Sequence, residues 1–161
     1  MQPFTQKVWF ETTLGQRLLS REQAIYDRAV GDVFGFYAVQ VGSPQINCLQ
    51  QSRIPNLIAT GNTTGDVHCE SSHLPFAESS IDLLCMPHVL EFSDNPHQTL
   101  REAARVLVPE GYVILTGFNP MSFWGLNKRM IKAHRYPWHG QFFSLSRIKD
   151  WLALLGLEFV E

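Results

Sequence analysis

The fold is decided by Ile81-Asp-Leu-Leu-Cys-Met-Pro-His88, an apolar run that ends at a Pro-His pair. A second apolar run, Tyr112-Val-Ile-Leu-Thr116, follows after a polar break and a helical pattern. Short apolar runs of this kind are typical of fully buried strands. Strands that alternate with helices form parallel sheets, which bind ligands at the carboxyl ends of their strands. The segment therefore predicts an α/β fold with a site near His88.

The helix between these two strands has clear start and stop signals. Asn95 can cap its first turn, and Pro96 takes the first helical position, where a missing N–H costs nothing. Apolar residues then recur at the i, i+3, i+4 and i+7 positions and give one face to bury: Leu100, Ala103, Ala104 and Leu107. Pro109 and Gly111 are expected to end the helix and turn the chain back into the sheet.

The chain is expected to form a single domain over residues 1–161, with a helical N-terminal extension over 1–30 and an α/β core over 36–161. A long helix is predicted over 5–30, in which Gly15 marks a close approach to a neighbour. The other expected elements are strands over 36–41, 57–60 and 66–70, a helix over 122–131, a helix that Ser144 caps and Gly156 ends, and a strand that starts at Leu157.

Composition excludes several classes of function. Of the 161 residues, 45% are hydrophobic, and the formal net charge of -2 provides no field to gather nucleic acid or anionic lipid. The sequence shows no apolar run of membrane-spanning length and no cleavable signal pattern, so we expect a cytoplasmic protein with no membrane partner. The spacing of its histidines and three cysteines matches no metal site, and buried free thiols are expected.

The order of motifs resembles the class I S-adenosylmethionine-dependent methyltransferases of the type 11 branch. The residues that carry the resemblance are Leu74-Pro-Phe76, Ile81-Asp-Leu-Leu84, His88-Val-Leu-Glu91, Leu100-Arg-Glu102, Arg105-Val-Leu107 and Pro109-Glu-Gly111. The resemblance implies a Rossmann-like three-layer sandwich with a mostly parallel sheet, here with an incomplete C-terminal hairpin. It also implies S-adenosyl-L-methionine as cofactor and methyl transfer to a small-molecule acceptor.

The resemblance also implies a set of site residues. The cofactor-binding residues would be Val41, Gly42, Ser43, Glu70, Ser71, Met86 and Pro87. Glu70 would accept a hydrogen bond from the adenine amino group, and Gly42 would be the turn over which methionine and ribose lie. Phe118 and Asn119 would face the acceptor. His88 is the candidate catalytic base, because a neighbouring helix N-terminus would favour its neutral form; the alternative is a histidine that only packs or caps there.

The sequence departs from the family pattern where the cofactor loop should be. Of the three glycines of that loop only Gly42 is present, and Pro44 and Ile46 take the other two places. Gln40 replaces the acidic residue common within the first strand, and the acidic residue expected directly after the second strand is absent. A degenerate domain that acts as a binding or regulatory module is therefore the alternative function. A nicotinamide-dependent oxidoreductase is a weaker one, since its glycine fingerprint is also missing.

The end of the sequence raises a further expectation. The predicted strand from Leu157 would begin a closing hairpin, and the sequence stops at Glu161. An uncovered sheet edge invites pairing with another chain. The sequence therefore predicts a homodimer formed through that edge, or a chain cut from a longer protein.

Overall fold

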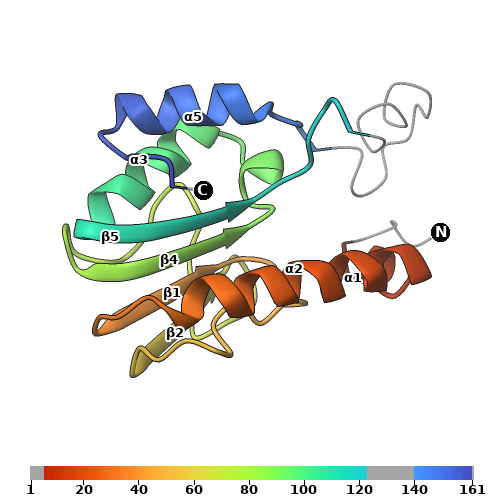
Figure 1. Ribbon diagram of the computed structural model, residues 1–161, viewed down its shortest axis with the longest axis horizontal. Coiled ribbons are helices and arrows are strands. Elements are labelled where there is room, and N and C mark those ends of the chain that lie inside the picture. Colours follow the sequence, from red (N-terminus) through yellow and green to blue (C-terminus); the bar gives the residue numbers. More distant parts are fainter. Residues whose placement is uncertain (1–5, 123–139, 161) are drawn as a thin grey trace.

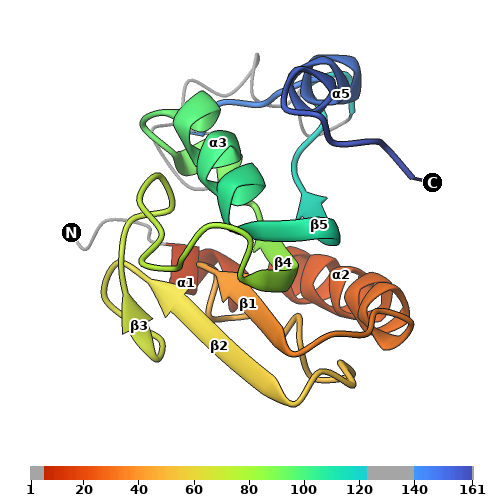
Figure 2. The ribbon, with the colours of Figure 1, turned by 90° about the vertical axis from the view of Figure 1, so that its left-hand side faces the viewer.

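A computed structural model describes residues 6–122 and 140–160 and shows a five-stranded parallel sheet with the strand order β3-β2-β1-β4-β5 (Figures 1 and 2). The strands are β1 (Tyr37–Val41), β2 (Asn56–Gly61), β3 (Val67–His68), β4 (Ile81–Pro87) and β5 (Leu107–Thr116). The buried apolar run around Leu83 is β4, which pairs with both β1 and β5. The predicted α/β fold with a parallel sheet is confirmed.

Helices cover both faces of this sheet and make the expected three layers (Figures 1 and 2). The helices are α1 (Gln6–Phe10), α2 (Thr13–Gly31), α3 (Pro96–Val106) and α5 (Leu145–Leu154), with a 3-10 turn η1 (Leu90–Phe92) after β4. Leu83 and Cys85 of β4 pack with the α2 side, whereas Leu84 and Met86 pack with the α3 side. This alternation follows from the two-residue period of a strand. None of the described helices is both long and apolar enough to cross a bilayer.

Helix α3 begins as predicted and ends earlier. The Asn95 side chain accepts a hydrogen bond from the Gln98 N–H, and Pro96 opens the helix. Leu107, expected on the buried helix face, is instead the first residue of β5. It pairs with Ile81 across a register shift in β4, so the chain passes from helix to strand without a separate turn.

The N-terminal helix predicted over 5–30 is two helices. Thr12 caps α2 with its side chain, which accepts a hydrogen bond from the Gly15 N–H and donates one to the Trp9 carbonyl. A Cβ at Gly15 would lie 2.3 Å from the Trp9 carbonyl oxygen and 2.7 Å from the Phe10 Cα. The close approach expected at Gly15 is therefore the packing of α1 against the first turn of α2. Further along α2, Tyr26 and Val30 enter the core cluster that contains Leu83.

The strand predictions at Leu157 and at residues 66–70 differ from the structure. The strand expected from Leu157 is wrong, because residues 157–160 follow α5 without strand structure. Gly156 turns the chain with φ +76°, and the Leu157 N–H bonds back to the Leu152 carbonyl. Leu157 then packs against the helix layer. The strand expected over 66–70 is shorter, Val67–His68, and the helix expected over 122–131 lies outside the described residues, apart from its first.

We predict that Gly15→Ala will destabilise the protein, since its methyl group would meet backbone atoms of α1 that cannot move aside. The expected loss is about 2–3 kcal/mol in the free energy of unfolding, measured by urea denaturation. Gly31→Ala is the matched control, because it lies in the same helix and its added Cβ would meet nothing within 4 Å. A neutral or slightly stabilising effect is expected there. Equal effects of the two substitutions would contradict the packing of α1 on Gly15.

Candidate functional site

The carboxyl ends of the two central strands lie side by side and bring five predicted site residues together. Val41 ends β1 and is followed by Gly42 and Ser43, while Met86 and Pro87 end β4. The Ser43 hydroxyl donates a hydrogen bond of 2.8 Å to the Pro87 carbonyl and ties the two strand ends. Ligands of open parallel sheets bind at this edge.

The chain turns tightly as it leaves β1. Gly42 has φ +67°, a left-handed conformation that glycine adopts without steric cost. Its N–H donates to the Thr60 carbonyl of β2 at 2.8 Å. A Cβ built on Gly42 would meet only the Val89 Cγ2 within 4 Å, at 3.8 Å, so no described side chain packs tightly over the glycine.

The side chain of Gln40 holds the loop formed by residues 42–48, which we call the β1 loop. Its amide nitrogen donates to the carbonyls of Gly42, Ser43 and Ile46, at 3.2, 3.2 and 2.8 Å. Its amide oxygen accepts from the Cys48 N–H at 2.9 Å. Gln40 is 5% exposed, and these bonds satisfy polar groups that would otherwise be buried unpaired. A single neutral side chain thus fixes the loop that has only one glycine.

Neither bulky residue of the β1 loop occupies the turn at Gly42. Pro44 is exposed. Ile46 is 4% exposed and belongs to the core cluster that contains Tyr26 and Val30 of α2. Ile46 therefore packs the loop against the α2 layer, where its apolar surface is buried. Its side chain does not fill the space above Gly42.

Two other predicted cofactor residues follow β3, at the same edge of the sheet. Glu70 is exposed, and Ser71 is half-buried with its hydroxyl 3.4 Å from that of Thr99 on α3. In the strand order β1 and β2 separate β3 from β4, and the contact between Ser71 and Thr99 brings this segment against α3. The two residues predicted to bind adenine follow β3 at the ligand edge of the sheet, and within the described part of the chain no hydrogen bond joins them to the other five.

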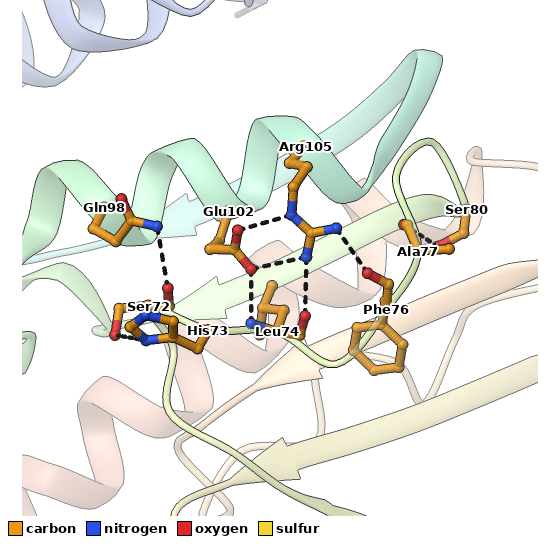
Figure 3. Close-up of polar contacts among 9 residues, drawn as sticks. All are labelled: Ser72, His73, Leu74, Phe76, Ala77, Ser80, Gln98, Glu102 and Arg105. Carbon is orange, nitrogen blue, oxygen red and sulfur yellow. Dashed lines mark hydrogen bonds and ion pairs between the residues drawn. The ribbon is translucent and has the colours of Figure 1, made fainter.

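A charged pair on α3 positions the chain between Ser71 and β4 (Figure 3). Arg105 binds both carboxylate oxygens of Glu102 at 2.8 Å and donates to the carbonyls of Leu74 and Phe76 at 3.0 and 2.9 Å. Glu102 in turn accepts from the Leu74 N–H at 2.9 Å, and Arg105 lowers the pKa of the Glu102 carboxyl. The sequence analysis did not find this contact, although the i, i+3 spacing of Glu102 and Arg105 is typical of a helical ion pair.

His88 lies in a buried cluster with two carboxylates. Its Nε2 is 2.6 Å from Oε1 of Glu22, and its Nδ1 is 3.0 Å from Oε1 of Glu91. We call Glu22, His88 and Glu91 the acid–histidine cluster. Burial alone lowers the pKa of His88, but hydrogen bonds to Glu22 and Glu91 outweigh it and raise that pKa to about 9. His88 is therefore a cation at neutral pH, and the expected neutral imidazole is not found.

The environment of His88 limits the chemistry it can perform. Its side chain is 2% exposed, and both ring nitrogens are occupied by carboxylates. Its backbone has φ +52°, which is uncommon for a residue other than glycine and needs firm surroundings to persist. Glu22 and Glu91 were not found from sequence. Glu22 is 66 positions from His88, and no local pattern reports such a contact.

The residues expected to face the acceptor lie beside this cluster. The Phe118 ring is 4.4 Å from the His88 ring, and its N–H donates to Oε1 of Glu91 at 2.8 Å. Trp9, Phe10 and Phe118 form a buried aromatic cluster at the carboxyl end of β4 and β5. Asn119 is exposed and its side chain accepts from the Met121 N–H, the geometry of a local turn.

The three cysteines are free thiols, and two of them, Cys48 and Cys85, are buried as expected. Burial raises the pKa of both thiols, that of Cys85 to about 12. Neither is a thiolate at neutral pH, so nucleophilic cysteine chemistry is excluded for these two residues.

About half of the chain matches the model of a known protein family. The model of the family described as "Methyltransferase domain" matches residues 35–115, which include β1, β4, α3 and most of β5. The chain belongs to the type 11 branch of the methyltransferase domain family. The predicted family is thus confirmed.

Known relatives extend the match along the chain. An uncharacterized protein of Escherichia coli strain K12, YafS, is 38% identical over 131 residues, which cover 78% of this chain and 54% of that protein. This chain thus spans about half the length of that relative. Among solved structures, a possible histamine N-methyltransferase from Thermotoga maritima matches with a TM-score of 0.67 at 20% sequence identity. The match covers 95% of this chain and 76% of the Thermotoga chain.

A second solved structure was determined with ligands. The geranyl diphosphate C-methyltransferase of Streptomyces coelicolor, in complex with Mg²⁺, geranyl diphosphate and S-adenosyl-L-homocysteine, has a TM-score of 0.63 at 13% identity. The match covers 95% of this chain and 70% of that chain. At this level of identity the two structures show that the methyltransferase fold is shared.

We predict that Arg105→Gln will loosen the segment from Ser72 to Ala77, because the Leu74 and Phe76 carbonyls lose their donors. The expected loss of stability is about 1–3 kcal/mol. Amide hydrogen exchange measured by mass spectrometry should show reduced protection in a peptide that covers this segment. Arg101→Gln, an exposed position on the same helix, is the control and should leave that exchange unchanged. Unchanged protection in Arg105→Gln would contradict the role of Arg105 in holding this segment.

We predict that the acid–histidine cluster makes stability fall at alkaline pH. The folded state raises the pKa of His88 from 6.5 to about 9 through Glu22 of α2 and Glu91 of η1. The stabilisation is complete below about pH 6.5 and is lost as the pH rises through about 9; it amounts to roughly 3 kcal/mol. Urea denaturation of wild type and His88→Gln at pH 7 and pH 10 measures it. The wild type should lose more stability than the variant, and equal losses would refute a protonated His88.

Proposed function

We propose that this domain binds S-adenosyl-L-methionine and transfers its methyl group to a small-molecule acceptor. The observation that carries the proposal is the turn at Gly42, which has left-handed backbone at the carboxyl end of a central parallel strand and no described side chain packed tightly over it. Such a turn lets a ligand approach the backbone closely. The solved methyltransferase that holds S-adenosyl-L-homocysteine on the same fold supports this choice of cofactor.

The residues of this edge fit such a cofactor. Val41, Gly42 and Ser43 would hold it from the β1 side, and Met86 and Pro87 from the β4 side. Glu70 and Ser71 would hold its adenine end, where an exposed carboxylate can accept from an amino group. These seven residues are the proposed cofactor-binding set.

Methyl transfer makes modest demands on the protein, because the bound sulfonium supplies an already activated methyl group. What the protein contributes is alignment and exclusion of water. Residues buried at this edge suit that task, among them Met86 and the aromatic cluster that contains Phe118. The likeness to a possible histamine N-methyltransferase and a geranyl diphosphate C-methyltransferase supports a small-molecule acceptor.

The role of His88 follows from its contacts. To act as the base that we predicted from sequence, it would have to release a carboxylate and a proton held with a pKa of about 9. We therefore assign His88 a positioning role: its bonds to Glu22 and Glu91 fix the chain directly after Pro87. A base with a free nitrogen and a pKa near 7 would serve catalysis better.

We predict that Gly42→Val abolishes cofactor binding. A β-branched side chain is strained at φ +67° and would also enter the space over the turn. Isothermal titration calorimetry with S-adenosylmethionine and S-adenosylhomocysteine should give a submillimolar dissociation constant for the wild type and no detectable binding for the variant. Gly156→Val is the control, because Gly156 has φ +76° and lies outside the site, after α5.

The outcomes separate the two functions that the sequence left open. Retained binding in Gly156→Val with loss in Gly42→Val supports a cofactor site at the β1 loop. Absence of binding to the wild type at millimolar ligand would refute the proposal and favour a module without catalysis. Binding that survives Gly42→Val would place the cofactor elsewhere.

A further inference from the structure

The β1 loop carries no charge of its own, although it borders the proposed cofactor site. Residues 41–49 contain neither aspartate nor glutamate. Near the end of β1, the amide nitrogen of Gln40 donates to three loop carbonyls, and its amide oxygen accepts from one loop N–H. Any charge that a ligand meets from the β1 side must therefore come from another element.

Helix α2 lies against the β1 loop and carries the buried acidic residue Glu22. Gln23 exchanges two hydrogen bonds with the backbone of Asn47, at 2.8 and 3.2 Å. The preceding residue, Glu22, reaches the carboxyl end of β4, where its Oε1 bonds His88. His88 directly follows Pro87, and the Pro87 carbonyl accepts a hydrogen bond from the Ser43 hydroxyl. The Glu22 carboxylate thus reaches the β1 loop through His88, Pro87 and Ser43, and the neighbouring Gln23 holds α2 against the same loop.

Among the described residues, Glu22 leaves one carboxylate oxygen without a hydrogen-bond partner. The residue is 7% exposed, and its Oε2 is buried with no hydrogen-bond partner among the residues that the structure describes. Buried polar atoms are normally paired, and a buried carboxylate oxygen left unpaired is costly. The atom is therefore ready to accept a hydrogen bond or to face a positive charge.

The cluster as a whole is negatively charged. Two carboxylates face one imidazolium, since His88 keeps its proton at neutral pH. This leaves one unit of negative charge in surroundings where charges act more strongly than in water. Such a charge favours a cationic ligand over a neutral one of the same shape.

We propose that Glu22 is a specificity-determining residue that makes the site prefer the positively charged S-adenosylmethionine over its neutral product. This inference rests on the proposed function. The substrate carries a sulfonium, an ammonium and a carboxylate, whereas S-adenosylhomocysteine has lost the sulfonium charge with the methyl group. Attraction to the cluster weakens when the methyl group leaves, so the product is released more readily.

The test compares ratios of dissociation constants in the wild type and Glu22→Gln. Gln keeps the shape of the side chain and can still accept from His88. Calorimetry with S-adenosylmethionine and S-adenosylhomocysteine gives the two constants, and sinefungin, which bears an amine near the sulfonium position, is a second cationic probe. We expect Glu22→Gln to lower the preference for both cationic ligands on the order of tenfold, with little change for S-adenosylhomocysteine. Glu158→Gln, an exposed position after α5, is the control.

Glu91→Gln provides a second variant in case Glu22→Gln does not fold. It removes the same unit of charge from the other side of His88 and retains an oxygen for the Phe118 N–H. The preference should fall here too. Thermal denaturation checks that every variant is folded.

The possible failures are distinguishable. If the wild type binds both ligands and the ratio of their constants is the same in the folded variants, the specificity role of Glu22 is refuted and the cofactor site stands. If both ligands weaken equally in both variants, the cluster is structural only, which also refutes the specificity role. If the wild type binds neither ligand, the proposed function falls and this inference with it.

Discussion

The amide of Gln40 is the constraint on which the ligand edge of this protein depends. It bonds both ends of the β1 loop, from the Gly42 carbonyl to the Cys48 N–H. A loop rich in glycine can turn because its backbone is unrestricted. Here the turn after β1 is held by hydrogen bonds to one buried side chain, and Ile46 packs the loop against α2. Rigidity supplied in this way costs a ligand little ordering entropy when it binds.

The buried acid–histidine cluster plays a similar part at the carboxyl end of β4. The strained backbone of His88 and the turn into η1 persist because two carboxylates and the Phe118 ring surround the imidazole. Protonation of His88 between the two carboxylates stabilises the fold, but desolvation of the buried charges offsets part of the gain from pairing them. The cluster also fixes geometry: Glu22 joins α2 to the end of β4, and Glu91 joins η1 to the start of the chain after β5.

Sequence patterns predicted the elements whose signals are local. The cap at Asn95, the apolar period of α3 and the buried run of β4 specified the βαβ unit, and the structure has it with one early ending at Val106. The break between α1 and α2 could not be read from periodicity, since it depends on how Trp9 lies against Gly15. The apolar pattern from Leu157 predicted a strand, but in the structure Leu157 packs with Leu152 of α5 and its N–H bonds the Leu152 carbonyl.

The candidate site shows the same division between local and distant information. Gly42 was accessible to sequence reasoning because a glycine after a buried strand has a conformational meaning. The compensation by Gln40 was not, because an amide within a strand gives no indication that it will bond a loop. The partners of His88 lie on α2 and η1, and only the folded sheet brings them together. A loop with a single glycine can therefore be held by a side chain of the preceding strand, and the missing glycines alone are weak evidence against a working site.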